Sequence, residues 1–346
     1  MKAEKYQGRN HTMNYMKALA CVCVLMLHCG FPGIIGKLLY GPSRFAVPFF
    51  FMVSGYYAYH DDARKTISRL SGKIRHIATL LIGTEIIYFI WHVIQSAINA
   101  GKEGVAEWFF NTFNTSKLIQ LLCFQTTPIG DVSWFLVALF LCYVATYFIA
   151  KYQLWKLFSG MVPVLLLINI FVGEILPFFG VNSQWYWCSN FWVLGLPFYS
   201  MGFWIKRNQE SLREKCSVKN TIVVVVISLM LLTIERIITN ASQLFVGNIF
   251  MAMTLFLFSV KYPSFFKTRS FIETIGEKYA FFVYVLHPIV RDVLYRTVLE
   301  SVGLSTHIII TWTRPVVVFI ICAGIAKAVY GLESKYAGLI KQARGV

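Results

Sequence analysis

Four ionisable side chains that could do chemistry lie within stretches of sequence that are otherwise apolar. Lys17 and His28 lie in the first stretch, Glu85 in the third and His287 in the ninth. Ionisable groups are costly to bury in a membrane, so each is a candidate functional residue. An imidazole or a carboxylate can act as a general base, and a lysine can bind an anion. The structural alternatives are an interfacial lysine anchor, packing histidines and an internal ion pair or hydrogen bond of Glu85.

The spacing of Lys17 and His28 places both on one helical face. They are eleven positions apart, which at about 100° per residue is three turns and roughly 20°. The two side chains then lie about 16 Å apart along the axis. A cation near the cytoplasmic end and an imidazole towards the outer third suit a long anionic ligand that enters from the cytosol. We expect the arm of such a ligand to run along this face.

The composition indicates a membrane protein. Of 346 residues, 57% are apolar and 14% are charged, whereas soluble domains have about 25% charged residues. This contrast excludes an ordinary soluble enzyme, a disordered chain and a collagen-like rod. A bilayer core needs about 20 apolar residues in a helix.

The fold class that follows is all-α, a polytopic membrane bundle of about ten transmembrane helices. We expect a single domain over residues 1–346, with no appended soluble domain. The predicted spans are residues 13–29, 41–59, 74–98, 133–150, 157–172, 187–205, 220–234, 244–260, 279–298 and 308–330.

Basic residues set the predicted orientation of the bundle. Lys and Arg exceed Asp and Glu by 32 to 16, a net charge of +16. Of these 32 basic residues, 24 fall in segments that are inner if the N-terminus is cytoplasmic, and 8 fall in outer segments. Cytoplasmic loops of membrane proteins collect Lys and Arg. The pattern therefore predicts that both termini lie in the cytoplasm, and a bacterial plasma membrane is the default location. It also explains the positive net charge without a role in binding nucleic acid.

The densest basic run is the inner loop at residues 64–76. Its residues Arg69, Lys73 and Arg75 could hold phosphate groups, because cationic side chains bind phosphate strongly. The alternative is topological charge or binding of anionic lipid headgroups.

Two further features leave alternatives open. Residues 108–124 mix aromatic and aliphatic side chains with polar ones, which fits either a helix on the outer leaflet or a packed loop. The eight cysteines contain no C-x-x-C pair, so we expect no metal site. A disulfide among Cys29, Cys123 and Cys188 remains an option, because the sequence cannot decide connectivity.

Six segments in order resemble the acyltransferase-3 family of integral membrane proteins. The family has Arg, ten residues and His in its first span, where this chain has Lys17 and His28. The family's basic loop reads R-x-x-R, and here Gly72 stands in the first position and Arg75 in the second. The six segments are residues 17–28, 44–56, 69–75, 133–136, 195–202 and 284–288.

This resemblance implies transfer of an acyl group, usually acetyl from acetyl-CoA, to an extracytoplasmic glycan, a lipid-linked sugar or another surface acceptor. It implies that His28 is catalytic, and we expect Glu85 to assist it by orienting the imidazole. The partners are then acyl-CoA, the acceptor and membrane lipids. The remaining expected contacts are Lys17, Arg69, Lys73 and Arg75 with acyl-CoA, and Trp134, His287 and Ser54 with the substrate, with Trp134 stacking on a sugar face.

The first two segments also resemble the membrane half of vancomycin-resistance serine racemases. That similarity suggests an alternative function, a transporter of a small solute such as serine, with Glu85 and His287 as substrate or proton sites. A third alternative is a structural membrane protein that binds anionic lipids. Dependence on acyl-CoA separates the first function from both others.

Overall fold

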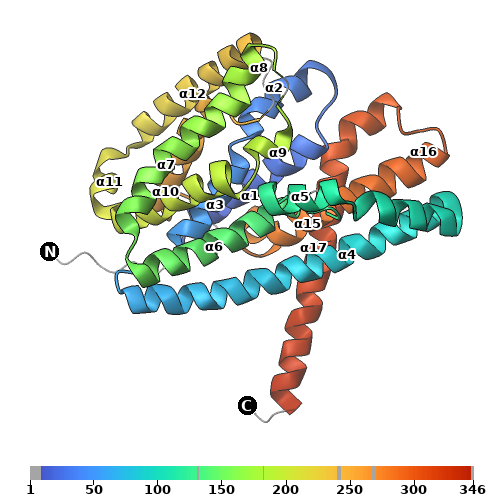
Figure 1. Cartoon of the computed structure of the whole chain (residues 1–346), viewed down its shortest axis with the longest axis horizontal. Coiled ribbons are helices and arrows are strands. Elements are labelled where there is room, and N and C mark those ends of the chain that lie inside the picture. Colours follow the sequence, from blue (N-terminus) through green and yellow to red (C-terminus); the bar gives the residue numbers. More distant parts are fainter. Residues whose placement is uncertain (1–8, 131, 182, 240–242, 267–269, 344–346) are drawn as a thin grey trace. The chain divides into compact units, whose positions relative to one another are not determined.

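The computed structural model describes residues 9–130, 132–181, 183–239, 243–266 and 270–343, and within them every regular element is a helix (Figure 1). The chain divides into two compact units, each described here by itself. Unit 1 comprises Met1–Ala46, Glu210–Val226 and Met251–Val346, and unit 2 comprises Val47–Gln209 and Ile227–Phe250.

Unit 1 is built around the first helix and the C-terminal helices. Its elements are α1 (His11–His28), α2 (Gly33–Ser43), α11 (Gln209–Lys215), the first part of α12 (Val218–Thr239), most of α13 (Val246–Lys261), α14 (Phe271–Thr274), the π-helix η3 (Ile275–Tyr279), α15 (Ala280–Arg291), the π-helix η4 (Asp292–Val298), α16 (Leu299–Ser301) and α17 (Ile308–Ala343).

Helix α1 packs against η3 with the two backbones in contact. The side chain of Asn10 caps α1 by accepting a hydrogen bond from the Met13 amide at 2.8 Å. A Cβ atom added at Gly276 would lie 1.8 Å from the carbonyl oxygen of Asn14, so only glycine allows this approach. Beside it, Ala18 packs into a buried cluster with residues of η3 and α17. The rotation of α1 within unit 1 is therefore fixed.

Unit 2 contains the longest helix of the chain. Its elements are α3 (Ala46–Tyr56), α4 (Ala63–Thr112), α5 (Thr115–Phe124), α6 (Trp134–Tyr152), α7 (Trp155–Ile170), the π-helix η1 (Phe171–Ile175), α8 (Leu176–Phe178), α9 (Trp185–Cys188), the π-helix η2 (Phe191–Gly195), α10 (Leu196–Arg207), the last part of α12 and the start of α13.

Helix α4 begins at a side-chain cap and is interrupted near residue 100. The Asp62 carboxylate accepts a hydrogen bond from the Arg64 amide at 2.8 Å, which satisfies one unpaired donor of the first turn. Ala100 and Gly101 leave helical geometry, and Gly101 has a φ of 61°. The apolar segment predicted at residues 74–98 ends just before this interruption, and α4 packs along α6.

Two glycines bring α3 and α10 into contact. A Cβ atom at Gly55 would lie 1.9 Å from the Tyr199 carbonyl oxygen, and one at Gly202 would lie 1.9 Å from the Met52 carbonyl oxygen. Both glycines belong to the sequence segments that carry the family resemblance. Their physical role is to let two helix backbones touch from both sides.

The structure confirms an all-helical membrane protein and revises parts of the prediction. Most of each predicted span is helical, although residues 41–59 form two helices, α2 and α3, and residues 187–205 are interrupted between α9 and η2. Within the described residues, five helices are long and apolar enough to cross a membrane: Ala63–Thr112, Trp134–Tyr152, Phe158–Phe178, Val218–Ile238 and Ile308–Leu332. The count of ten and the cytoplasmic termini stay predictions, and residues 1–8 and 344–346 lie outside the described part.

Two open alternatives are now decided. Residues 108–124 are helical, in the end of α4 and in α5, where Asn114 accepts a hydrogen bond from the Lys117 amide at 3.0 Å. No residue of α5 is buried, so the packed-loop alternative is wrong. All eight cysteines lie in the described residues as free thiols, and the disulfide considered among three of them is absent.

We expect Gly202→Ala to destabilise the protein by about 1–3 kcal/mol, because the added methyl group must push α10 away from α3. The measurement is thermal unfolding of purified protein in detergent. Gly160→Ala in α7 is the matched control, because a Cβ atom there meets nothing within 4 Å. Equal losses of stability in both variants would contradict the close approach.

Candidate functional site

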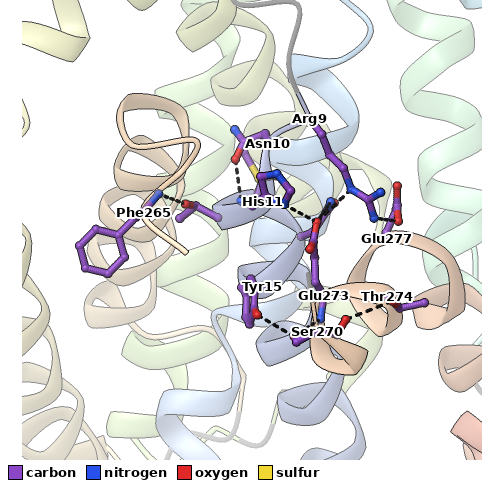
Figure 2. Close-up of polar contacts among 12 residues, drawn as sticks. Arg9, Asn10, His11, Tyr15, Phe265, Ser270, Glu273, Thr274 and Glu277 are labelled. Carbon is purple, nitrogen blue, oxygen red and sulfur yellow. Dashed lines mark hydrogen bonds and ion pairs between the residues drawn. The ribbon is translucent and has the colours of Figure 1, made fainter. Parts of the chain in front are cut away.

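The start of α1 is tied to α14 and η3 through one buried carboxylate (Figure 2). The side chain of Glu273 is fully buried, and its Oε1 atom lies 2.9 Å from Arg9 Nε, 2.9 Å from His11 Nδ1 and 3.2 Å from Asn14 Nδ2. Arg9 also pairs with Glu277. Charge-assisted hydrogen bonds of this kind are stronger than neutral ones. The network fixes the N-terminal end of α1, whereas His28 lies at the C-terminal end.

Hydroxyl groups extend the same network. Ser270 caps α14, since its Oγ atom accepts a hydrogen bond from the Glu273 amide at 3.2 Å. The Tyr15 hydroxyl donates to Ser270 Oγ at 2.6 Å, as Figure 2 shows. On another side of α1, Thr12 Oγ1 accepts from the Phe265 amide at 3.1 Å. The first two turns of α1 are thus bonded to two separate segments of unit 1.

The network also sets the ionisation of Glu273. Burial by itself would raise the pKa of this carboxyl, but hydrogen bonds from Asn14 and His11 and the positive charges of His11 and Arg9 outweigh it. The pKa of Glu273 is therefore lowered from its ordinary value.

At the other end of α1, His28 stands beside His287. His28 is the last residue of α1 and is exposed, whereas His287 in α15 is 1% exposed. Their ring centroids lie 5.0 Å apart with an interplanar angle of 50°. The Nδ1 atom of His287 lies 3.2 Å from the Val283 carbonyl oxygen, which assigns the proton to Nδ1. Its Nε2 atom is buried without a hydrogen-bond partner among the described residues.

Two arginines hold the backbone that carries His28. Arg291 Nη1 donates to the His28 carbonyl oxygen at 3.4 Å, and Arg314 Nη2 donates to the Gly30 carbonyl oxygen at 3.2 Å. Cations are favoured at a helix C-terminus, where carbonyl groups lack partners. Arg291 also forms an ion pair with Asp292, with its Nε atom 2.8 Å from Asp292 Oδ1.

Lys17 and His28 do lie on one face of α1, but side chains pack along the face between them. Cys21, Val24 and Leu25 are at most 4% exposed. Lys17 is half-buried and has no hydrogen bond or ion pair with the described residues. Apolar side chains therefore fill the length of α1 between the two polar ends, and the path of a ligand arm along this face stays a prediction.

In unit 2, the Glu85 carboxylate lies beside hydroxyl groups, and two oxygen atoms of this polar group lack a hydrogen-bond partner among the described residues. Glu85 is half-buried in α4, and the Ser133 and Thr127 hydroxyls lie near its carboxylate. The Glu85 Oε1 and Ser133 Oγ atoms are nevertheless buried without a hydrogen-bond partner among the described residues. Buried polar atoms are usually paired, so unpaired ones call for an explanation such as a ligand or water. This group offers oxygen atoms that can bind hydroxyl groups.

Aromatic rings lie on the elements around this group. Trp134, which follows Ser133 at the start of α6, is half-buried with its ring centroid 6.4 Å from that of Trp185. On α4, the rings of Tyr88 and His92 lie 6.3 Å apart, and His92 stacks on Trp108 at 5.7 Å. Glu85, Tyr88 and His92 follow one another at spacings of three and four residues on one face of α4, and the two rings of that face continue to Trp108.

The three basic residues of α4 predicted to bind phosphate lie on two sides of the helix. Arg69 and Lys73 are four residues apart on one face, and Lys73 Nζ lies 5.6 Å from the centre of the Tyr143 ring. Arg75 is exposed, and two residues beyond Lys73 it points to a different side of the helix. None of the three makes an ion pair with a described residue.

Ser54 lies beside this basic face rather than near Trp134. Its hydroxyl donates to the Phe50 carbonyl oxygen of its own helix at 2.9 Å and is also close to the Tyr143 hydroxyl. Tyr143 is the same ring that Lys73 contacts. Ser54 therefore has a local structural role in α3, and its expected contact with substrate stays a prediction.

The structure brings some predicted residues together and reveals others. Unit 1 holds His28 and His287, whereas Glu85 is in unit 2, so that its orienting role towards His28 stays a prediction. Sequence reasoning missed Glu273, although Ser270 followed three residues later by Glu273 is a capping-box pattern. It also missed the contact of Arg314 with Gly30, for which the sequence holds no local signal. Within the described residues, no three His, Cys, Asp or Glu side chains gather as a metal site.

Comparison with known proteins gives one finding about the whole chain. Residues 10–330 match the acyltransferase-3 family model, which is described as an acyltransferase domain. No curated protein matches the chain, and no solved structure matches it.

We expect the folded protein to lose stability as the pH falls through the lowered pKa of Glu273. Its carboxylate contributes stability above its unfolded-state pKa, because folding holds it ionised, and protonation removes that contribution. Thermal unfolding in detergent from pH 7 to about pH 2 measures this loss, because the lowered pKa lies below the ordinary value of a glutamate. Glu273→Gln should be less stable at pH 7 and depend less on pH. Glu300→Gln, at an exposed position of α16, should behave as the wild type, and an unchanged pH profile in Glu273→Gln would refute the assignment.

Proposed function

The chain belongs to the acyltransferase-3 family and is a membrane acyltransferase, and on this premise we propose the reaction that it catalyses. It moves an acetyl group from cytosolic acyl-CoA to a hydroxyl group of an extracytoplasmic glycan or another cell-surface acceptor. A bacterial plasma membrane is the proposed location.

The observation that carries this proposal is the exposed His28 ring beside the buried His287 ring. A hydroxyl oxygen attacks a thioester carbonyl carbon efficiently only when a base takes its proton. A neutral imidazole serves as that base near pH 7. His28 accepts the proton while the C–O bond forms, and it returns the proton to the sulfur atom when the C–S bond breaks. In an alternative course of the reaction, His28 itself carries the acetyl group briefly.

His287 serves as a positioning residue in this proposal. Its Nδ1 proton is directed at the Val283 carbonyl, so its Nε2 atom is an acceptor without a partner among the described residues. That atom can accept a hydrogen bond from the His28 ring and hold the other ring nitrogen of His28 ready to accept a proton. The contacts of Arg291 and Arg314 with the end of α1 support the same position of His28.

Both substrates have proposed contacts in the chain. Lys17, Arg69, Lys73 and Arg75 contact the phosphate groups of acyl-CoA, and the absence of carboxylate partners for them among the described residues supports this role. Trp134 stacks on a sugar ring of the acceptor, because a flat apolar face binds the apolar face of a sugar. The unpaired oxygen atoms of Glu85 and Ser133 then bind acceptor hydroxyl groups.

We expect His28→Ala to lower acetyl transfer at least about 100-fold, because removal of a general base costs about that much. We expect His287→Gln to lower kcat about tenfold with an unchanged KM for acetyl-CoA, because it disturbs only the orientation of His28. The measurement is transfer of labelled acetyl from acetyl-CoA to the cell-envelope glycans of the host in reconstituted vesicles.

His307→Ala is the matched control, since His307 is an exposed histidine of unit 1 whose ring makes no hydrogen bond with the described residues. It should keep full activity. Wild-type activity in folded His28→Ala would contradict the proposed mechanism, and a wild-type protein that uses no acyl-CoA would contradict the proposed reaction.

We expect Glu85→Gln to reduce transfer to glycan about tenfold, because one oxygen acceptor and its charge are lost. Hydrolysis of acetyl-CoA without acceptor should continue, because that reaction needs no glycan contact. Glu103→Gln, at an exposed position of the same long helix, is the control. Equal loss of transfer and hydrolysis in Glu85→Gln would place Glu85 outside the acceptor site.

A further inference from the structure

A cavity lies between the start of α7 and the end of α10 in unit 2. It is open to solvent, and its volume is about 740 Å³. The predicted topology places both helix ends on the cytoplasmic side. The residues that line the cavity are Gln153, Leu154, Trp155, Lys156, Ser159 and Arg207.

Two positively charged side chains line the cavity. Lys156 and Arg207 are both exposed, and neither makes an ion pair or hydrogen bond with a described residue. No acidic side chain lines the cavity. A guanidinium group binds phosphate through two parallel hydrogen bonds, and an ammonium group binds it as a point charge. The lining therefore favours a ligand with phosphate groups.

The cavity also has an aromatic wall that is held in place. Trp155 stacks on Phe203, with ring centroids 5.0 Å apart and an interplanar angle of 21°. Phe203 in turn meets the Tyr59 ring edge to face at 4.9 Å. An indole fixed by such packing is a platform on which a nucleic-acid base can stack. Phosphate-binding cations beside such a platform suit a nucleotide better than a lipid headgroup.

The row of rings formed by Trp155, Phe203 and Tyr59 links the cavity to Arg69, which is already proposed to bind the acyl donor. Arg69 Nη1 donates a hydrogen bond to the Tyr59 carbonyl oxygen at 3.4 Å. Arg69 thus lies at the far end of the row Tyr59, Phe203 and Trp155. The cations of α4 and the cavity belong to the same end of unit 2.

We propose that this cavity binds the adenine nucleotide end of the acyl-CoA donor. Arg207 and Lys156 contact its phosphate groups, and Trp155 stacks on its base. This inference rests on the proposed function, because it assigns a nucleotide site to the acyl donor named there. It concerns binding alone, and no bond is formed or broken at the cavity.

The test compares donors that differ only in the nucleotide. Full-length protein in lipid nanodiscs is assayed with acetyl-CoA and with S-acetylpantetheine, which lacks the nucleotide. In Arg207→Gln and in the double variant with Lys156→Gln, the KM for acetyl-CoA should rise about tenfold or more, because charged hydrogen bonds to phosphate are lost. The KM for S-acetylpantetheine and both kcat values should not change. Trp155→Leu should weaken inhibition by adenosine 3′,5′-bisphosphate.

Lys65→Gln is the matched control, because Lys65 is an exposed lysine at the start of α4 and does not line the cavity. It should leave every constant unchanged. An unchanged KM for acetyl-CoA in the double variant would overturn the inference while acetyl transfer itself stands. An equal rise for both donors would also overturn it, since the variant would then act on folding.

A further experiment distinguishes the two possible sources of the phosphate group, acyl-CoA and a lipid headgroup. If the cavity binds lipid headgroups, the KM effect will appear only in nanodiscs that contain phosphatidylglycerol, and adenosine 3′,5′-bisphosphate will inhibit all variants equally. That result overturns the inference. A wild-type protein that neither binds nor uses acetyl-CoA would instead overturn the proposed function, and this inference with it.

Discussion

The arrangement of unit 1 depends on the buried carboxylate of Glu273. A carboxylate removed from water is strongly destabilising unless donors surround it, and here the donors come from Arg9, His11 and Asn14 at the start of α1. Only one rotation and one axial position of α1 bring all three to the same oxygen atom. Gly276 allows the backbone contact that this position requires. The face of α1 that points into unit 1 follows from this single constraint.

The same constraint determines what stands at the far end of α1. With the helix held at its start, Lys17 and His28 fall on the packed face, where Cys21, Val24 and Leu25 fill the length between them. His28 then meets His287, and the last carbonyl groups of the helix meet two arginines. A polar site in an apolar protein is thus built at a helix end, where the backbone itself needs polar partners.

Unit 2 combines tight helix packing with polar groups left unpaired. Gly55 and Gly202 let α3 and α10 touch, and small residues serve this purpose at many helix contacts in membranes. In contrast, the oxygen atoms of Glu85 and Ser133 have no partner among the described residues. The cavity beside Trp155 likewise carries two cations without counter-ions in the described part of the chain. A well-packed frame therefore supports sites that can bind polar ligands.

The sequence by itself determined the membrane character, the helical fold class, the positions of the apolar helices and the family. These properties depend on composition, on hydropathy along the chain and on short motifs, all of which are local. It also placed Lys17 and His28 on one face, because helix geometry alone fixes that relation. Only the tertiary structure decided that this face is packed, that His287 stands beside His28, and that Trp155 and Arg207 line one cavity. These contacts join residues far apart in the chain, and the packing of one helix against another sets them.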